Sequence, residues 1–584
     1  MWRCHHSDAE PCTGTADRTP VTHERSNPVP SDRALRPPCR LLPSRWRTLA
    51  LTAALSCSLN APPAWAQVRL PALGETAAED FTAGSERRLG DQIMAEVLRD
   101  PDYLDDAVLQ EYLISLWRPL VASARARGEI EADVDGQFAW DAFLVRDRNV
   151  NAFALPGGWV GVYLGLIAMT ATRDELASVM AHELSHVTQR HIARGMVNSQ
   201  RASLIGLAGA ILAILAASRS SNADIVNAAM VGGQAAAIQG QLNFSRDMER
   251  EADRVGYGVL VSAGFAPTGM AAMFDKLDSA NRLNDNGAFP YLRSHPLTTE
   301  RLSEARSRSL LGGEPPATPG LLHAMMQARA RVLMDTNPQS LRRLQEPLAG
   351  TTSASPRERV SQLYAGALAS SLMRDHTQAD AAWQLIAKEV AKSTPREPAA
   401  ERQLLLLQSQ LRLARGDAAG ALQALNAIDV DADVDAEKRA PMMLRAQAAL
   451  DAKHQGNADA AAELRRSTEA LQTWLAEHRR DAGAWTLLAS TADAIGLRLR
   501  SLRANAEARA AEGDLNGAID RLRAAQGAAR GATQGQDFID ASIIDARLRD
   551  LQGQRRQIAL EARGNRDRQR PEGDTPQLGS KAKP

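Results

Sequence analysis

The stretch HELSHVTQRH, residues 182–191, decides how the rest of the chain is interpreted. Its first five residues have the pattern H-E-x-x-H. On a helix, positions i and i+4 share one face, so His182 and His186 can bind one Zn²⁺. Glu183 is rotated by about 100° from His182. This rotation suits a carboxylate that takes a proton from water and does not bind the metal. The stretch therefore predicts two zinc ligands and a general base, but not a complete site.

The residues before H-E-x-x-H predict where its helix begins. Thr172-Arg173-Asp174-Glu175 has the pattern of a capping box. Gly195 predicts the end of the same helix. Apolar residues at helical spacing give the helix a buried face: Leu176, Val179, Met180, Leu184 and Val187.

His191 is not expected to be the third ligand. It lies roughly 140° from His186 on a continuous helix, well off the ligand face. The three-histidine pattern of metzincins also requires Gly in place of Gln189 and His in place of Ile192. We interpret His191 as a structural residue or as a residue that supports a ligand.

A better candidate for the third ligand lies downstream, since catalytic zinc usually has three protein ligands. Residues 247–253 open another helix, on which Glu249 and Asp253 share a face. Glu249 could ligate zinc while Asp253 accepts the N–H of a zinc-bound imidazole. The small Ala252 and Gly256 would let two helices approach closely. The alternative is an exposed charge cluster, because three further charged residues surround this pair. They are Arg250, Glu251 and Arg254.

These residues carry a family resemblance. HELSHVTQRH followed by E-x-x-A-D at 249–253 resembles the HtpX and CAAX-prenyl-protease type of zinc endopeptidase. Over residues 75–310 the similarity narrows to the BepA-like periplasmic metalloproteases of outer-membrane biogenesis. It is carried there by NAFALPGG at 151–158 and SHPL at 294–297, followed by Glu-Arg at 300–301. The resemblance implies one zinc per chain, bound by His182, His186 and Glu249, with Glu183 as the base.

The resemblance also gives His295 a role that spacing alone does not show. It implies that His295 can occupy the remaining position on zinc and hold the enzyme latent. His295 would then be both a fourth ligand and a residue that controls catalysis. The alternative is an ordinary loop histidine before Pro296.

Composition limits the classes of protein that fit. The four cysteines all precede residue 67, so the remainder has neither a disulfide framework nor a thiolate metal site. The 69 basic and 69 acidic residues balance, which gives no indication of a nucleic-acid partner. With 584 residues, 44% hydrophobic but only 4% aromatic, the chain is expected to contain several mainly helical domains. We predict a zincin-type α+β metalloprotease domain with a small sheet, followed by an α-solenoid.

The N-terminal 66 residues predict export. Residues 1–43 show no apolar period and are either unstructured or upstream of the true start codon. A basic segment at 45–47, an apolar run at 49–59 and an A-x-A motif ending at Ala66 follow. We expect cleavage between Ala66 and Gln67 and a periplasmic protein. The apolar run is too short for a spanning anchor, and a lipobox is disfavoured because Ala54 stands where Leu is expected.

Residues 67–310 are predicted to form the peptidase domain. Its expected elements before the metal helix are helices 79–99 and 109–127 and strands 138–145, 151–155 and 159–163. The edge of this short sheet could pair with an extended substrate backbone. Alternatively, the sheet only closes the core.

Between the two ligand segments, residues 203–217 are apolar nearly all round. Three alternatives stay open. The segment could be a helical lid over the active site, a membrane-surface helix giving peripheral membrane contact, or part of a transmembrane hairpin.

The second half of the chain predicts helical repeats. Residues 311–319 are a linker by composition, 320–564 are helical, and 565–584 are expected to be disordered. GDAAGA at 416–421 recurs as GDLNGA at 513–518, close to three repeats of about 34 residues. The motif resembles the turn of a tetratricopeptide (TPR) repeat. A generic helical array is the alternative. Helix pairs are expected near 360–393, 400–428, 438–478, 482–496 and 503–530.

Taken together, the sequence predicts an exported zinc endopeptidase whose repeats would present protein substrates. The resemblance implies that it degrades misassembled or misfolded envelope proteins. It also implies that the chain assists outer-membrane protein assembly, with the assembly machinery as a partner. A second hypothesis is a chaperone or assembly factor with latched or minor proteolysis. A third is a structural protein with chance histidines, which predicts no bound metal.

Overall fold

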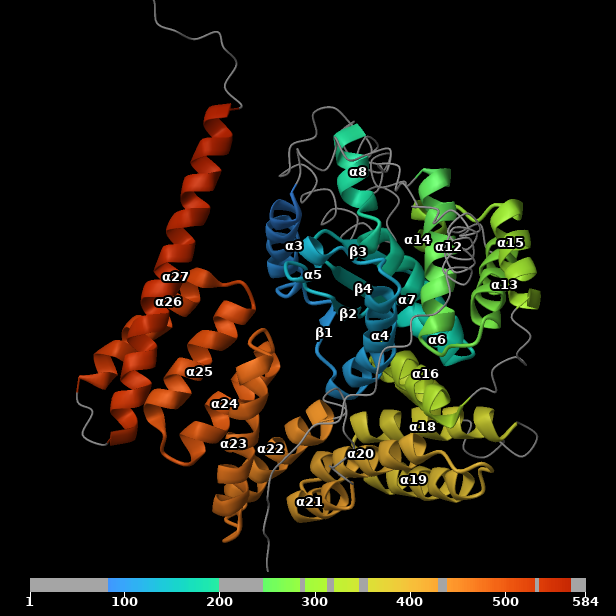
Figure 1. Ribbon diagram of the computed structural model, residues 1–584. Helices are drawn as coiled ribbons and strands as arrows, with labels where there is room; N and C mark the ends of the chain where they lie inside the picture. Colours follow the sequence, from blue (N-terminus) through green and yellow to red (C-terminus); the bar gives the residue numbers. More distant parts are fainter. Residues whose placement is uncertain are drawn as a thin grey trace, which may run out of the picture. The chain divides into compact units, whose positions relative to one another are not determined.

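The structure is a computed structural model, shown in Figure 1, and its described residues all belong to one compact unit, Leu73–Pro584. It describes residues 82–198, 245–283, 289–311, 320–345, 355–428, 438–530 and 535–568. The predicted signal peptide and the apolar segment 203–217 lie outside these ranges. Among the described residues, no helix has the length and apolar character needed to cross a membrane.

A four-stranded sheet stands beside the metal helix. Its order is β1 (Tyr103–Leu104), β2 (Asp141–Val145), β4 (Trp159–Tyr163) and β3 (Ala152–Leu155). β2 and β4 are parallel, whereas β1 and β3 pair antiparallel with their neighbours. The three predicted strands are confirmed. β1 was not predicted, because two residues carry no alternation that a pattern could reveal.

The sheet is buried on both faces by residues that alternate along its strands. One side, which includes Leu144 and Val162, packs in the main core with helices α4 (Ala107–Ala126) and α7 (Arg173–Thr188). The opposite side packs against helix α3 (Ala83–Val97) in a separate cluster. Strand β4 is buried at all five residues. The sheet therefore forms a layer between α3 on one side and α4 and α7 on the other.

The turn between β3 and β4 needs its glycines. Gly157 and Gly158 have φ angles of 76° and 88°, which side chains other than glycine rarely adopt. A Cβ at Gly158 would also lie 2.9 Å from the Cβ of Phe138. The turn thus fixes the β3–β4 hairpin and leaves β3 at the edge of the described sheet.

Helix α7 begins where the sequence predicts but ends earlier. The side chain of Thr172 accepts a hydrogen bond from the Glu175 N–H at 3.1 Å, while the Glu175 carboxylate accepts from the Ala171 N–H. The predicted end at Gly195 is wrong. The helix stops at Thr188, Arg190 takes a left-handed φ of 52°, and helix α8 starts at His191.

The remaining helices of the peptidase half surround α7. They are α5 (Ala132–Asp135), α6 (Leu164–Met169), α12 (Arg246–Ser262), α13 (Thr268–Leu283), α14 (Pro290–Ser294) and α15 (Thr299–Leu311). Both α12 and α13 pack directly on α7. Leu311, the first residue of the predicted linker, is the last residue of α15.

The second half consists of paired helices, as predicted (Figure 1). After α16 (Leu321–Leu333) and α17 (Pro338–Gln345), the pairs are α18 (Pro356–Leu372) with α19 (His376–Ala391), α20 (Pro398–Ala414) with α21 (Ala418–Asn426), α22 (Arg439–His454) with α23 (Ala460–Glu477), α24 (Ala482–Ala494) with α25 (Arg498–Ala511), and α26 (Leu515–Ala529) with α27 (Gly535–Arg568). Helix α27 extends four residues, 565–568, into the predicted tail.

The repeated G-D motif has the same geometry in both copies. Gly416 and Gly513 have φ angles of 82° and 77°. The next residue in each copy accepts a hydrogen bond from the backbone N–H three residues later. Asp417 accepts from Gly420 and Asp514 accepts from Gly517, each at 2.8 Å. Each motif therefore ends one helix and caps the next. The first three predicted helix pairs are confirmed. The last two predicted boundaries are wrong, because 482–496 holds the single helix α24 and 503–530 holds parts of two pairs, α25 and α26. The assignment as TPR repeats stays a prediction.

A buried ion pair ties the two halves together. Arg329 on α16 binds Asp106, the N-cap residue of α4, through two contacts of 2.7 Å. Arg329 is 2% exposed and also reaches Tyr364 on α18 and Gln410 on α20. One guanidinium thus connects helix α4 of the peptidase half to three helices of the second half, α16, α18 and α20.

Candidate metal centre

Two helices bring the predicted ligands together. Helix α7 carries His182, Glu183 and His186, all buried. Helix α12 starts at the N-cap Ser245 and carries Glu249 on its first turn. The predicted second helix is confirmed, and the alternative of an exposed charge cluster is wrong for Glu249, which is 1% exposed.

The two helices approach closely because α12 has a glycine at the crossing. A Cβ on Gly256 would lie 3.1 Å from the Ala181 carbonyl oxygen and 3.2 Å from the His182 Cα. Ala252 is fully buried nearby. The expectation that small residues permit this approach is confirmed, and it places Glu249 above the histidines.

His295 enters the same cluster from a third element. It caps α14, where its backbone N–H donates to the Tyr291 carbonyl at 2.8 Å. The Tyr291 ring packs against the His295 ring with a centroid distance of 4.7 Å. His295 is 2% exposed, and its place among the other donors favours a ligand over an ordinary loop histidine.

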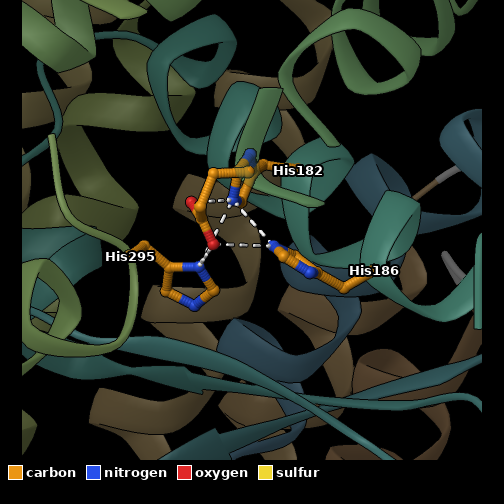
Figure 2. Close-up of side chains that lie close together, drawn as sticks. His182, His186 and His295 are labelled. Carbon is orange, nitrogen blue, oxygen red and sulfur yellow. Dashed lines mark hydrogen bonds and ion pairs between the residues drawn. The ribbon is translucent and has the colours of Figure 1, made fainter. Parts of the chain in front are cut away.

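Four donor groups converge on one point (Figure 2). His182 Nε2 lies 3.0 Å from His186 Nε2 and 3.4 Å from His295 Nδ1. The Glu249 carboxylate lies 3.0 Å from His295 Nδ1, 3.5 Å from His182 Nε2 and 3.6 Å from His186 Nε2. One ligand atom from each of the four residues falls within 4.8 Å of all the others.

This donor set fits tetrahedral zinc. With zinc–ligand bonds of 2.0–2.1 Å, the donor atoms of a tetrahedron stand about 3.3 Å apart. Five of the six donor pairs are 3.0 to 3.6 Å apart, with either oxygen of Glu249 as the donor, and all four ligand atoms lie within 4.8 Å of one another. Three imidazole nitrogens and one carboxylate are donors that zinc accepts. No cysteine is needed, in keeping with the sequence.

Glu183 lies beside the donor set without belonging to it. It is fully buried, and its Oε1 lies 3.5 Å from His295 Nε2. Within the described part of the chain, neither of its carboxylate oxygens makes a hydrogen bond. Burying a carboxylate without donors is costly. This arrangement is understandable for a group that meets water or substrate during a reaction.

Asp253 stands behind His182, as predicted, and Arg301 holds it there. Asp253 Oδ1 lies 3.0 Å from His182 Nδ1. The guanidinium of Arg301 binds both Asp253 oxygens, at 2.6 and 2.8 Å, and the Glu249 carboxylate at 2.8 Å. It also donates to the Pro296 carbonyl at 2.7 Å. In the sequence analysis Arg301 was only part of the family resemblance. Its burial beside two acids could not be predicted from the spacing of residues along the sequence.

The break after α7 moves His191 toward the centre. His191 Nδ1 lies 2.9 Å from His186 Nδ1, and its Nε2 lies 3.0 Å from the Glu251 carboxylate. His191 is outside the donor set, as predicted, and whether it is structural or supports a ligand stays a prediction. The register argument behind that prediction was wrong, because it assumed a continuous helix. Glu251, assigned to a charge cluster, was missed.

The surroundings favour the metal-binding form of His186 and of Glu249, whereas without metal they favour the protonated form of His182. Burial lowers the pKa of His186 well below its usual value, and neighbouring His182 and His295 lower it further. Although burial acts to raise it, the pKa of Glu249 is held below its usual value by His295 and His182. Burial acts to lower the pKa of His182, but hydrogen bonds to Asp253 and Glu249 raise it to about 9. A neutral imidazole and an ionised carboxylate are the ligating species.

The region of this site is similar to a known peptidase family. Residues 113–309, which include the whole donor set, match Peptidase family M48. This confirms the family resemblance drawn from the motifs. Zinc is the metal of this family, in agreement with the four converging donors.

Individual relatives match 171 to 244 residues of the chain. The beta-barrel assembly-enhancing protease of Escherichia coli K12 is 36% identical over 240 residues, which cover 41% of this chain and 47% of the relative. That of Yersinia pestis is 36% identical over 244 residues, covering 42% and 48%. The metalloprotease LoiP of Escherichia coli K12 is 32% identical over 171 residues, covering 28% and 61%. The chain spans about half the length of the assembly-enhancing relatives it matches.

Proposed function

Starting from the match of residues 113–309 to Peptidase family M48, we propose that the chain is a zinc-dependent endopeptidase. His182, His186 and Glu249 are the zinc ligands, and Glu183 is the general base. One observation carries this proposal. Two helices and a loop, from three separate parts of the chain, bring four donors to tetrahedral spacing with an unbonded buried carboxylate beside them.

When bound, zinc polarises the scissile carbonyl and makes water more acidic. The protein groups do the rest. Glu183 takes the proton of the attacking water and passes it to the leaving amine. Arg301 and Asp253 keep Glu249 and His182 oriented throughout. The strand β3 contacts α7 and has no strand partner on its outer side among the described residues, so that side would receive an extended substrate.

His295 gives this enzyme a resting state. Its Nδ1 completes the donor set, and its Nε2 lies 3.5 Å from Glu183. In this position it occupies the place that water and substrate need, and it stands against the base. Catalysis then requires His295 to move away, which makes the loop after α14 a two-state latch.

The envelope role is proposed from the relatives' names and from the sequence. Two of the relatives are described as beta-barrel assembly-enhancing proteases. We propose the same role here: after export, the chain degrades misassembled outer-membrane proteins and assists their assembly. The paired helices α18 to α27 would present these clients and contact the assembly machinery. The second candidate is a mainly chaperone role, favoured by the closed position of His295.

Zinc content and cleavage test the proposal together. The chain beginning at Gln67 should contain one equivalent of zinc by elemental analysis and should cleave an unfolded outer-membrane protein. His186→Ala should lose most of the zinc, whereas Arg254→Met, an exposed change on α12, should retain it. A metal-free wild-type protein would favour the chance-histidine hypothesis. A zinc-bound protein that cleaves nothing, even without His295, would exclude the peptidase function.

A further inference from the structure

The His186 ring has two nitrogens, and only one of them faces the donor set (Figure 2). Its Nε2 lies 3.0 Å from His182 Nε2 and 3.6 Å from Glu249 Oε1. Its Nδ1 lies on the far side of the ring, 2.9 Å from His191 Nδ1. The His191 ring is fully buried and stands nearly perpendicular to that of His186, at 75°. Something other than the metal therefore fixes the far side of His186.

Zinc binding by His186 would assign the hydrogen-bond roles along this contact. If Nε2 of His186 binds zinc, its Nδ1 carries the proton and must donate it. Nδ1 of His191 is then the acceptor, which leaves the proton of His191 on Nε2. That nitrogen lies 3.0 Å from Glu251 Oε2, and the same oxygen lies 2.9 Å from Arg194 Nη1. The N–H groups of His186, His191 and Arg194 in this hydrogen-bonded series thus each meet an acceptor.

We propose that His191, Glu251 and Arg194 form a hydrogen-bonded chain that orients His186 for zinc binding. These are positioning residues, since none of them contacts the metal position. The inference rests on the proposed function, because it requires His186 to be a zinc ligand. It goes beyond that function by assigning a task to a histidine that lies outside the donor set and to a carboxylate on α12.

The two histidine ligands are then supported in different ways. His182 meets the carboxylate of Asp253 directly, and that carboxylate is held by Arg301. His186 meets a neutral imidazole first, and the carboxylate lies one ring further away. An intervening ring donates less electron density to the ligand than a direct carboxylate does. Both carboxylates come from α12, two residues apart.

The backbone is bent to make this chain possible. On a continuous helix, His191 would point roughly 140° away from His186. Instead α7 ends at Thr188, and Arg190 adopts a φ of 52°. A left-handed conformation is unfavourable for a non-glycine residue. The Arg190 side chain is held by the buried Glu86 on α3, at 3.2 Å, which fixes the bend.

The proposed hydrogen-bonded series is tested by measuring zinc affinity in competition with a chelator. This measurement does not require proteolysis. His191→Leu removes the acceptor and should lower the affinity about 10–100-fold. His191→Gln should restore most of it, because an amide presents an acceptor and a donor about as far apart as two ring nitrogens. Glu251→Met should lower the affinity less than His191→Leu does. The matched control on the same helix is Arg254→Met, which should change nothing.

A double variant shows whether His191 and Glu251 act on zinc affinity through one hydrogen-bonded series or independently. In the His191→Leu background, Glu251→Met should cause no further loss, because the link is already broken. Additive losses would overturn the proposal, as would an affinity of His191→Leu within about threefold of wild type. Failure of the wild-type protein itself to bind zinc would instead contradict the proposed function. Circular dichroism checks folding, and if His191→Leu does not fold, Glu251→Met and Arg194→Met carry the test, with unchanged affinity in both counting against the chain.

Discussion

Glu183 is the residue whose substitution separates proteolysis from any other task of the chain. Glu183→Gln keeps the size of the side chain and removes the base. We expect zinc content to stay at one equivalent and cleavage to fall by about 10²–10⁴-fold. The variant should be no less stable than wild type, because the buried carboxylate makes no hydrogen bond within the described residues.

The same variant also distinguishes the two candidate roles. If Glu183→Gln cleaves nothing but fully supports outer-membrane assembly in cells, proteolysis is not the main task. If assembly fails together with cleavage, the peptidase role is primary. Asp247→Asn is a suitable control, because Asp247 is an exposed acid on α12.

His295 allows a second prediction at the scale of one side chain. His295→Ala removes a donor from the set and clears the space beside Glu183. We expect cleavage of an unfolded client to rise severalfold, with zinc retained by His182, His186 and Glu249. A fall in cleavage with zinc retained would contradict the latch and would indicate that His295 stabilises the transition state.

At the scale of the element, the crossing of α7 and α12 decides the geometry of the site. Gly256→Val places a side chain against the Ala181 carbonyl and the His182 Cα, both rigid backbone. We expect α12 to be displaced, zinc affinity to fall at least tenfold, and the protein to lose about 1–3 kcal/mol of stability.

Gly258→Val is the matched control for this prediction. It introduces the same side chain into the same helix and meets only the guanidinium of Arg127, which can move. Any cost of a β-branched residue in a helix is therefore shared by both variants. Equal zinc affinity of the two variants would contradict the importance of the close approach.

The elements also show what a sequence reveals. The start of α7, the strands β2 to β4 and the capped helix pairs were predictable, because local spacing and capping residues specify them. The break at Arg190 was not, since an arginine rather than a glycine takes the left-handed conformation. The partnerships of Arg301 and Glu251 join residues 48 and 60 positions from their contacts, and no local pattern encodes them.

At the scale of the whole molecule, the buried Arg329–Asp106 pair connects the peptidase half with the helical pairs. Arg329→Met leaves the Asp106 carboxylate buried and uncompensated. We expect the free energy of unfolding, measured in urea, to fall by about 3–5 kcal/mol.

A second substitution shows whether the lost charge pairing is the cause. Asp106→Asn in the Arg329→Met background removes the remaining charge but can still cap α4 at the Leu109 N–H. The double variant should recover at least about half of the loss. No recovery would mean that Arg329 acts mainly through its other contacts, with Tyr364 and Gln410.

Helix α12 carries every acidic group that serves the two histidines, at positions 249, 251 and 253. Without metal, Glu249 loses the cation that it would ligate, and the two histidines lose the bond that holds them toward this helix. Local opening should therefore concentrate there. After chelation, the amide protons of α12 should exchange with deuterium markedly faster, whereas those of α26 should exchange at an unchanged rate. This single helix would then serve as an internal gauge of metal occupancy, readable by mass spectrometry even when no substrate is known.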